Sequence, residues 1–294
     1  MASSNRDNFI DFIYIGAPRS GSTWLSKALN EHPQIWIPPT KEVHFFNDRH
    51  ILQFEHKYSK GITYYRKIFK SAPSKAKLGE LSPLYYFDPS TAYRIYKHFP
   101  NTRIIAFLRN PVDVVFSYYL LLKRLGKFGS NFESELVKSP QLLDLGFYHR
   151  NLTQYFDWFP KEQIHIEIYE NFFQNPSENI IGVYRFIEVS DTFCPSMIDK
   201  KINAASEAGS FFSFKFLGFV TKMLNRSSFS GLKKILELLK FDKLYYNKII
   251  NSHPSVNKPK INSHIRQELL SIYKPDIKRL ENSLKVDLKS WLDS

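Results

Sequence analysis

The sequence predicts an α/β fold in which a central, mainly parallel sheet is flanked by helices. Apolar runs of buried-strand length occupy residues 9–15, 103–108 and 163–169. Each run is followed by a segment whose apolar residues recur at helical spacing. Such alternation is typical of parallel sheets, because a parallel connection has to cross back over the sheet. The 294 residues, 43% of them apolar, are enough for a substantial core, and we expect a single domain over residues 1–294.

Residues 8–30 contain the first strand, a glycine-containing turn and the first helix. Gly16 and Gly21 are separated by four residues and followed by Ser22 and Thr23, which is the spacing of the phosphate loop of nucleotide hydrolases. We therefore expect a three-layer fold of the P-loop type. The alternative is an ordinary strand–turn–helix unit in which the glycine spacing arose by chance.

The composition of this loop indicates an anion other than a nucleoside triphosphate. Ser22 stands where a nucleotide hydrolase has the lysine that reaches the β- and γ-phosphates, and a cation is found inside the loop at Arg19. The glycines let backbone amides approach an anion, the helix N-terminus adds partial positive charge, and Arg19 offers a bidentate fork. A single activated phosphate or sulfate fits these groups better.

The segment of residues 101–126 predicts a second anion contact. Arg109 follows the apolar run of residues 103–108, at the carboxyl end of a strand, where open α/β sheets bind ligands. Asn110 is a good N-cap, and Gly126 suits the end of the helix. Ser117 lies about two turns inside this helix, so Arg109 and Ser117 could reach one anion. The alternative makes Arg109 a surface ion-pair partner and Ser117 a packing hydroxyl.

The remaining predicted elements follow the same alternation. We expect strands at residues 34–37, 77–81 and 163–169, and helices from residue 88, over 142–159 and over 177–187. Residues 211–240 have an aromatic start and basic helical spacing, which fits packed helices, a lid or a membrane-surface helix. A last helix follows, and we expect its core face to contain Leu269, Ile272, Ile277, Leu280 and Leu284.

Two motifs resemble those of the sulfotransferases that use 3′-phosphoadenosine 5′-phosphosulfate (PAPS). These are PRSGSTW at residues 18–24 and RNPVDVVFSYY at residues 109–119. The resemblance implies that PAPS is the donor and 3′-phosphoadenosine 5′-phosphate (PAP) the product. It also implies that Arg109 and Ser117 bind the 3′-phosphate, that Trp24 lies against the adenine, and that the phosphosulfate is held by Arg19, Ser20, Gly21, Ser22 and Thr23.

A third stretch resembles the heparan sulfate sulfotransferases and their bacterial relatives. It comprises KEVHFFN at residues 41–47 and HKYSKGITYYRKIF at residues 56–69, and in that branch the residue matching Glu42 is the general base. A carboxylate on a loop that faces the donor can take the acceptor proton. His44 is the rival base, and an exposed Lys41–Glu42 pair is the alternative without catalysis. The glycan branch often has lysine where Leu81 stands, so this chain lacks one of its cations.

The resemblance implies in-line sulfuryl transfer to a hydroxyl or amine of a small-molecule or sugar acceptor. Two other functions stay open, a non-catalytic module that binds phosphonucleotides or polyanions and a nucleotide phosphotransferase. The second is disfavoured because the loop lysine and paired metal-binding acids are absent. The net charge of +13 favours anionic ligands. Without zinc-finger spacing or an aromatic RNA-binding signature, we expect no nucleic-acid partner, and we expect no metal site.

The sequence also predicts a cytoplasmic location. The first residues lack the basic and apolar regions of a signal peptide, and no apolar stretch reaches the roughly 18 residues of a membrane span. Cys194 is the only cysteine, so no internal disulfide can form, and we expect it to be an inert, buried thiol. The Arg-Lys-Gly donor segment of soluble sulfotransferases is absent, and residues 201–203 or 257–260 are candidates to replace it.

Overall fold

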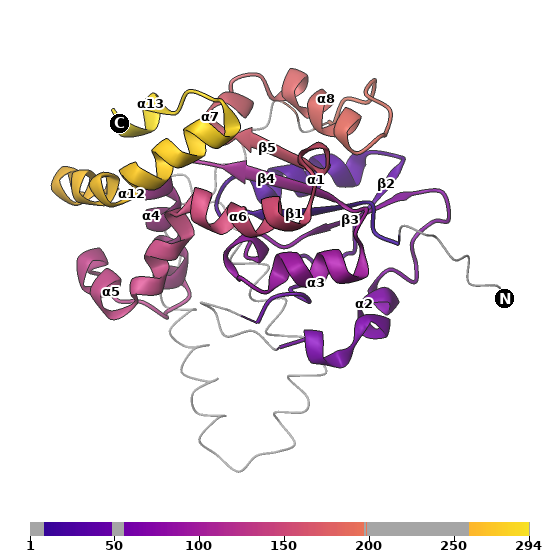
Figure 1. The fold of residues 1–294 in the computed structure, drawn as a ribbon, viewed down its shortest axis with the longest axis horizontal. Coiled ribbons are helices and arrows are strands. Elements are labelled where there is room, and N and C mark those ends of the chain that lie inside the picture. Colours follow the sequence, from indigo (N-terminus) through magenta and orange to yellow (C-terminus); the bar gives the residue numbers. More distant parts are fainter. Residues whose placement is uncertain (1–8, 49–55, 197, 199–258, 294) are drawn as a thin grey trace, which may run out of the picture. The chain divides into compact units, whose positions relative to one another are not determined.

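The computed structural model describes residues 9–48, 56–196, 198 and 259–293 (Figure 1). They fall into two compact units. The first comprises the described parts of Met1–Val115, Pro140–Ile202 and His264–Ser294, and the second those of Phe116–Ser139 and Asn203–Ser263. Helix α4 (Pro111–Arg124) begins in the first unit and ends in the second.

The first unit contains a five-stranded sheet in which every pair of neighbouring strands is parallel. The strand order is β2-β3-β1-β4-β5. From β1 the chain first adds β2 and β3 on one side of β1 and then adds β4 and β5 on its other side. The carboxyl ends of β1 and β4 therefore form the topological switch point, where such sheets bind ligands. The bounds are β1 (Phe12–Gly16), β2 (Ile35–Trp36), β3 (Lys77–Leu81), β4 (Arg103–Leu108) and β5 (Ile164–Ile168).

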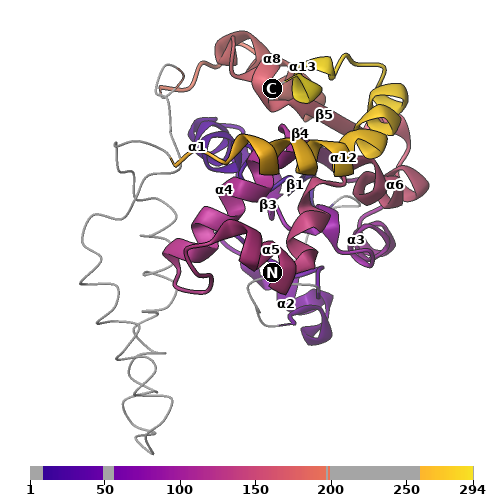
Figure 2. The same ribbon diagram turned by 90° about the vertical axis from the view of Figure 1, so that its left-hand side faces the viewer.

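Helices cover both faces of this sheet. On one face α1 (Ser22–Glu31) and α8 (Pro176–Phe186) share a buried cluster with Phe12, Tyr14 and Phe107 of the sheet. Figure 2 shows α3 (Thr91–His98) and α6 (Tyr148–Trp158) on the other side of the sheet from α1. The expected three-layer architecture with a parallel central sheet is confirmed.

Short helices complete the described chain. In the second unit, α5 is Phe132–Lys138. The first unit contains α2 (Ile62–Ile68), α7 (Tyr169–Phe172), α13 (Lys289–Leu292) and the 3₁₀ helices η1 (Tyr58–Lys60), η2 (Tyr85–Phe87), η3 (Pro140–Gly146) and η4 (Lys161–Gln163). Helix α12 (Ser263–Leu284) belongs to the first unit from His264 onward.

Both ends of α4 carry the predicted signals. The Asn110 side chain accepts a hydrogen bond from the Val112 amide at 3.0 Å, which caps the N-terminus. Beyond the other end, Gly126 has a φ of +70°, and its amide donates to the Lys123 carbonyl at 3.0 Å. A glycine is favoured there because left-handed backbone costs other residues a Cβ clash.

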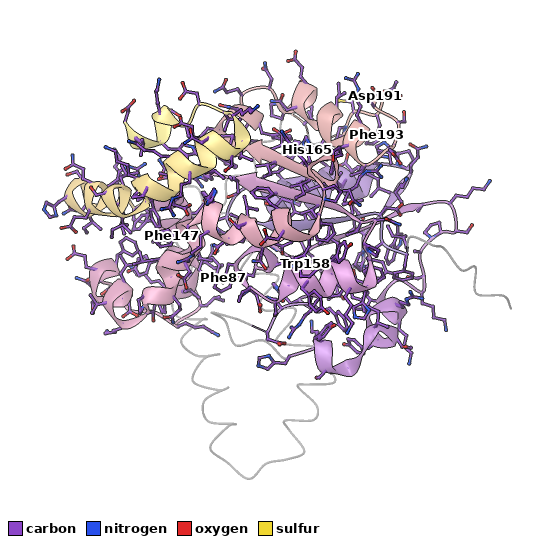
Figure 3. The ribbon with its side chains drawn as sticks, in the orientation of Figure 1. Phe87, Phe147, Trp158, His165, Asp191 and Phe193 are labelled. Carbon is purple, nitrogen blue, oxygen red and sulfur yellow. The ribbon has the colours of Figure 1, made fainter. Side chains whose placement is uncertain are left out.

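The prediction of a single helix over residues 142–159 is wrong, because the helical structure is interrupted between η3 and α6. A Cβ on Gly146 would lie 2.5 Å from the ring of Tyr273 in α12. The ring of Phe147, which is labelled in Figure 3, packs against the same tyrosine, with centroids 5.0 Å apart. Asp276 of α12 accepts hydrogen bonds from the amides of His149 and Arg150 at 2.9 and 3.1 Å. The start of α6 is therefore set by a helix more than a hundred residues away.

Two expectations about side-chain burial are also wrong. Ile272, expected in the core face of α12, is 45% exposed, and Leu270 and Tyr273 are buried on that helix instead. The buried stripe includes the polar Asp276, which an apolar pattern does not reveal. Cys194 is exposed, not buried.

Some expectations fall on residues outside the described ones. These are the region of residues 211–240, the candidate donor segment at residues 201–203 and half of that at residues 257–260. In the described part of the chain, no helix has the length and apolar character needed to cross a membrane.

Candidate functional site

The loop between β1 and α1, residues 17–21, lies at the switch point and is held by hydrogen bonds to neighbouring residues. We call it the anion loop. The Tyr14 hydroxyl donates to the Ala17 carbonyl at 3.2 Å, and the Ala17 amide donates to the Phe107 carbonyl of β4 at 2.8 Å. Arg19 has a φ of +64° and Gly21 a φ of +87°. Left-handed residues inside such a turn direct successive backbone N–H groups into one concavity, which suits an anion.

The start of α1 completes this anion loop. Gly21 is the N-cap and provides no capping side chain, and the first turn carries no acidic residue, so the positive end of the helix is not neutralised locally. The Ser20 side chain is fully buried, and its hydroxyl has no hydrogen-bond partner among the described residues. A phosphate or sulfate fits this combination of amides, hydroxyls and helix dipole.

The Trp24 side chain is more deeply buried than a residue expected to contact adenine. Its side chain is 3% exposed, and its ring meets those of Phe172 and Phe173 edge-on, with centroids 5.6 and 5.3 Å apart. This position anchors α1 beneath the loop and gives an adenine ring little of the indole to lie against. The adenine contact stays a prediction.

Arg109 follows β4 and lies beside the anion loop. Its guanidinium stacks over the Tyr169 ring at 4.9 Å and donates to the Arg19 carbonyl at 3.5 Å and to Asp113 Oδ2 at 3.3 Å. The structure thus brings the two predicted anion contacts, Arg19 and Arg109, to the same end of the sheet. Ser117 belongs to the second unit, and its role beside Arg109 stays a prediction.

The backbone after β4 is fixed by a closed set of hydrogen bonds that the sequence did not indicate. Glu170 accepts from the Asn110 amide at 2.9 Å and from Trp291 Nε1 at 3.1 Å, and the Asn110 side chain donates to the Trp291 carbonyl at 3.1 Å. The Tyr148 hydroxyl donates to the Arg109 carbonyl at 2.7 Å. We call Asn110, Glu170 and Trp291 the Trp291 lock. It fixes the backbone from which Arg109 projects.

Glu42 and His44 lie against each other on the loop after β2. Glu42 Oε2 and His44 Nε2 are 2.8 Å apart, and the two side chains are 16% and 4% exposed. Burial raises the pKa of Glu42, but the hydrogen bond and charge of His44, together with Lys41 and Arg19, outweigh it and leave that pKa below its usual value. Glu42 is therefore an ionised carboxylate near the anion loop, able to accept a proton.

Lys41 is a candidate site residue that the sequence did not single out. The Lys41 ammonium donates to Thr23 Oγ1 at 3.3 Å, whereas the sequence offered only a surface pair with Glu42. Burial and the charges of Arg19 and Lys27, opposed by Glu42, lower the pKa of Lys41 to about 8. It thus brings a second cation to the first turn of α1.

A buried cluster beneath the loop of residues 44–46 holds it in place. Glu80, fully buried, accepts from the hydroxyls of Ser82, Tyr85 and Tyr65 at 2.7, 2.6 and 2.6 Å. Ser82 in turn accepts from the His44 amide at 3.1 Å, and Tyr85 from the amides of Phe45 and Phe46 at 2.8 and 3.2 Å. Burial raises the pKa of Glu80 although the three hydroxyls lower it. We call Glu80, Ser82, Tyr65 and Tyr85 the Glu80 brace.

The described residues contain no group of three or more His, Cys, Asp or Glu side chains that could hold a metal ion. Leu81, which stands where the glycan branch often has lysine, is buried at the end of β3. Among the described residues, Arg19, Lys41 and Arg109 are cations at or beside the anion loop.

Comparisons with known proteins identify the family and agree with the fold. The family described as "Sulfotransferase domain" matches residues 9–278. A crystal structure of a sulfotransferase from Alicyclobacillus acidocaldarius shares the fold with a TM-score of 0.70 and 24% identity, over 96% of this chain and 98% of that one.

Two curated relatives match parts of the chain. The membrane-associated sulfotransferase kil1 of Dictyostelium discoideum is 36% identical over 112 residues, which are 37% of this chain and 22% of that protein. Heparan sulfate glucosamine 3-O-sulfotransferase 5 of Mus musculus is 26% identical over 190 residues, which are 60% of this chain and 53% of that protein. The chain thus spans about half or less of the length of these relatives. From the family match over most of its length, the chain belongs to the sulfotransferase domain family.

Proposed function

We propose that this protein transfers a sulfuryl group from PAPS to a hydroxyl or amine of a sugar or small-molecule acceptor. The observation that carries the proposal is the ionised Glu42 beside a loop that presents amides and two cations, Arg19 and Lys41. General base catalysis needs a carboxylate next to the reacting group, and the leaving phosphate needs positive charge. The proposal places both groups around the loop that follows β1.

The donor supplies a sulfuryl group on an activated phosphate, and this chain has residues for both of its ends. The amides and hydroxyls of residues 20–23, with Arg19 and Lys41, would hold the 5′-phosphosulfate. Arg109 and Ser117 would hold the 3′-phosphate, as the resemblance implies. Support for the first group is the left-handed turn and uncapped helix, and support for Arg109 is its position beside the Arg19 carbonyl.

Glu42 is the base in this proposal. The acceptor proton moves to a Glu42 oxygen, the acceptor atom bonds to sulfur on the side opposite the leaving phosphate, and the sulfur–phosphate oxygen bond breaks. Arg19, Lys41 and the loop amides meet the charge that develops on that phosphate. His44 keeps Glu42 oriented through its 2.8 Å contact.

The acceptor class rests on the relatives. Relatives matched over 60% and 64% of this chain are named heparan sulfate glucosamine 3-O-sulfotransferase 5 and bifunctional heparan sulfate N-deacetylase/N-sulfotransferase, which favours a sugar hydroxyl or amine. The missing cation at Leu81 favours an acceptor less anionic than heparan sulfate. A cytoplasmic location remains a prediction from the sequence.

The test combines turnover with binding. Incubating the protein with PAPS labelled with radioactive sulfur and a panel of amino sugars, uncharged sugars and small alcohols should transfer label to at least one acceptor class. PAP binding without label transfer to any acceptor would favour the non-catalytic module. Phosphate transfer from ATP that needs magnesium would favour the phosphotransferase.

A further inference from the structure

Asp113 lies between two guanidinium groups that come from distant parts of the chain. Its Oδ2 accepts from Arg109 at 3.3 Å, and its Oδ1 accepts from Arg266 of α12 at 2.8 Å. The three side chains are only 20% to 34% exposed, so their charges act on one another with limited screening. Arg109 is the proposed contact of the 3′-phosphate, so the Asp113 carboxylate can compete with this phosphate for Arg109 and repel it.

The two ion pairs of Asp113 differ in the distance between nitrogen and oxygen. The 2.8 Å contact to Arg266 has the length of a strong charge-assisted hydrogen bond, whereas the 3.3 Å contact to Arg109 is long for one. Arg109 also donates to the Arg19 carbonyl at only 3.5 Å. The Arg109 guanidinium also lies over the Tyr169 ring, 4.9 Å from its centroid. Arg109 is thus oriented by weak contacts that a phosphate can replace, while Asp113 is paired mainly with Arg266.

We propose that Arg266 is a positioning residue for donor binding: by pairing with Asp113, it keeps that carboxylate from closing on Arg109 and offsets its charge beside the 3′-phosphate. The inference rests on the proposed function, since it assumes that Arg109 binds this phosphate. It explains why an acidic residue is compatible with an anion site, because a carboxylate beside a phosphate otherwise repels it.

The proposal predicts a specific pattern of binding by Arg266→Met, Asp113→Asn and the double variant. Losing Arg266 leaves Asp113 to compete for Arg109, so PAP should bind about tenfold more weakly, as for loss of one charge-assisted contact. Adenosine 5′-phosphate, which lacks the 3′-phosphate, should bind unchanged. Asp113→Asn should bind PAP at least as tightly as the wild type, and the double variant should recover to within about threefold of it. Arg266→Lys should keep most of the affinity.

Calorimetry with both nucleotides and thermal denaturation of every variant decide the matter. Arg150→Met, which breaks the ion pair with Asp144 at the start of α6, is the matched control and should leave both affinities unchanged. A double variant as weak as Arg266→Met would overturn the proposal, because Arg266 would then contact the phosphate itself. Equal losses for both nucleotides with a lower melting temperature would reduce Arg266 to a structural role.

Failure of the proposed function gives a different result. If the wild type binds PAP no more tightly than adenosine 5′-phosphate, Arg109 does not hold a 3′-phosphate, whatever the variants do. If the wild type prefers PAP but Arg266→Met keeps the full preference, only the role of Arg266 is refuted.

Discussion

The contact between Glu42 and His44 decides which side chain can act as the base. His44 lowers the pKa of Glu42 through its hydrogen bond and charge, despite burial, and its own φ of +49° is a left-handed conformation that non-glycine residues seldom adopt. Such backbone persists where surrounding contacts hold it, frequently at functional sites. These observations support the proposal in which Glu42 takes the proton and His44 orients Glu42.

Glu42→Gln keeps the shape of the side chain but removes the proton acceptor. Turnover should fall by roughly 10²- to 10⁴-fold, the contribution of general base catalysis, with PAP affinity nearly unchanged. Steady-state kinetics and calorimetry measure the two effects. Glu162→Gln, an exposed position in η4, is the control. Should His44→Ala abolish turnover while Glu42→Gln retains most of it, the two roles are reversed.

The pH dependence of kcat/KM offers an independent test of the base. Glu42 acts when deprotonated, so its contribution is lost as the pH falls through its pKa, which lies below the usual value. The profile should therefore be flat from about pH 5.5 to 7. A base with the ordinary imidazole pKa of about 6.5 would instead give an acidic limb in that range. Observing such a limb, absent in His44→Gln, would count against Glu42.

Lys41 should make donor binding sensitive to alkaline pH. Its pKa of about 8 means that its charge is lost as the pH rises through this value, so PAP affinity measured by calorimetry should weaken between pH 7 and 9.5. Lys41→Met should bind PAP about tenfold more weakly at pH 7, the cost of one charged contact, and lose this pH dependence. Lys67→Met, at an exposed position on α2, should behave as the wild type. A pH dependence that persists in Lys41→Met would assign it to another group.

Local signals in the sequence were enough for Arg19, Glu42, His44 and Arg109 to be proposed, because each lies within a short motif. Lys41 was missed because its contact is Thr23, 18 residues earlier. The pairing of Asp113 with Arg266 spans 153 residues, and no periodicity connects them. Contacts of this kind depend on how the helices pack, so they become visible only in the folded chain.

The loop of residues 44–46, which follows the proposed base Glu42, is supported by the Glu80 brace through three of its amides. The Tyr85 hydroxyl accepts from two successive loop amides, those of Phe45 and Phe46, and donates a hydrogen bond to Glu80 at 2.6 Å. The sequence did indicate strand β3, whose bounds were predicted correctly. It did not indicate that the carboxylate of Glu80 is buried and organises a neighbouring loop. Acidic side chains are seldom buried without hydrogen-bond partners, and the three hydroxyls that bind Glu80 are identified only in the folded chain.

Tyr85→Phe should weaken both the fold and the site. The change leaves the amides of Phe45 and Phe46 without their acceptor, at a cost of about 1–3 kcal/mol in the free energy of unfolding for a buried group left unpaired. Urea denaturation measures this loss, and turnover should fall as the loop loosens. Tyr64→Phe, at a position 36% exposed, is the control. Lower stability with unchanged turnover would mean that the brace supports the fold but not the base.

For the whole molecule, the order of apolar runs was enough to predict a parallel α/β sheet, and its five strands confirm this. The order in which those strands pair depends on long-range contacts, such as β1 between β3 and β4. The break between η3 and α6 was missed for the same reason, because α12 causes it.

Turnover by the whole protein should not need a metal ion. In the proposed reaction, Arg19, Lys41 and the loop amides stabilise the leaving phosphate, which is the task that magnesium performs in nucleotide hydrolases. Label transfer from PAPS should therefore be unchanged by excess EDTA. Loss of transfer in EDTA with recovery on adding magnesium would contradict this mechanism.

The Trp291 lock has a consequence for how the protein is made. The ribosome synthesises the anion loop and Arg109 early, whereas Trp291, which fixes the backbone behind Arg109 through Glu170, follows 181 residues after Asn110. Contacts between residues so distant in sequence form slowly. A nascent or truncated chain that ends before α13 would therefore carry every candidate binding residue and still lack the contacts that fix the backbone behind Arg109.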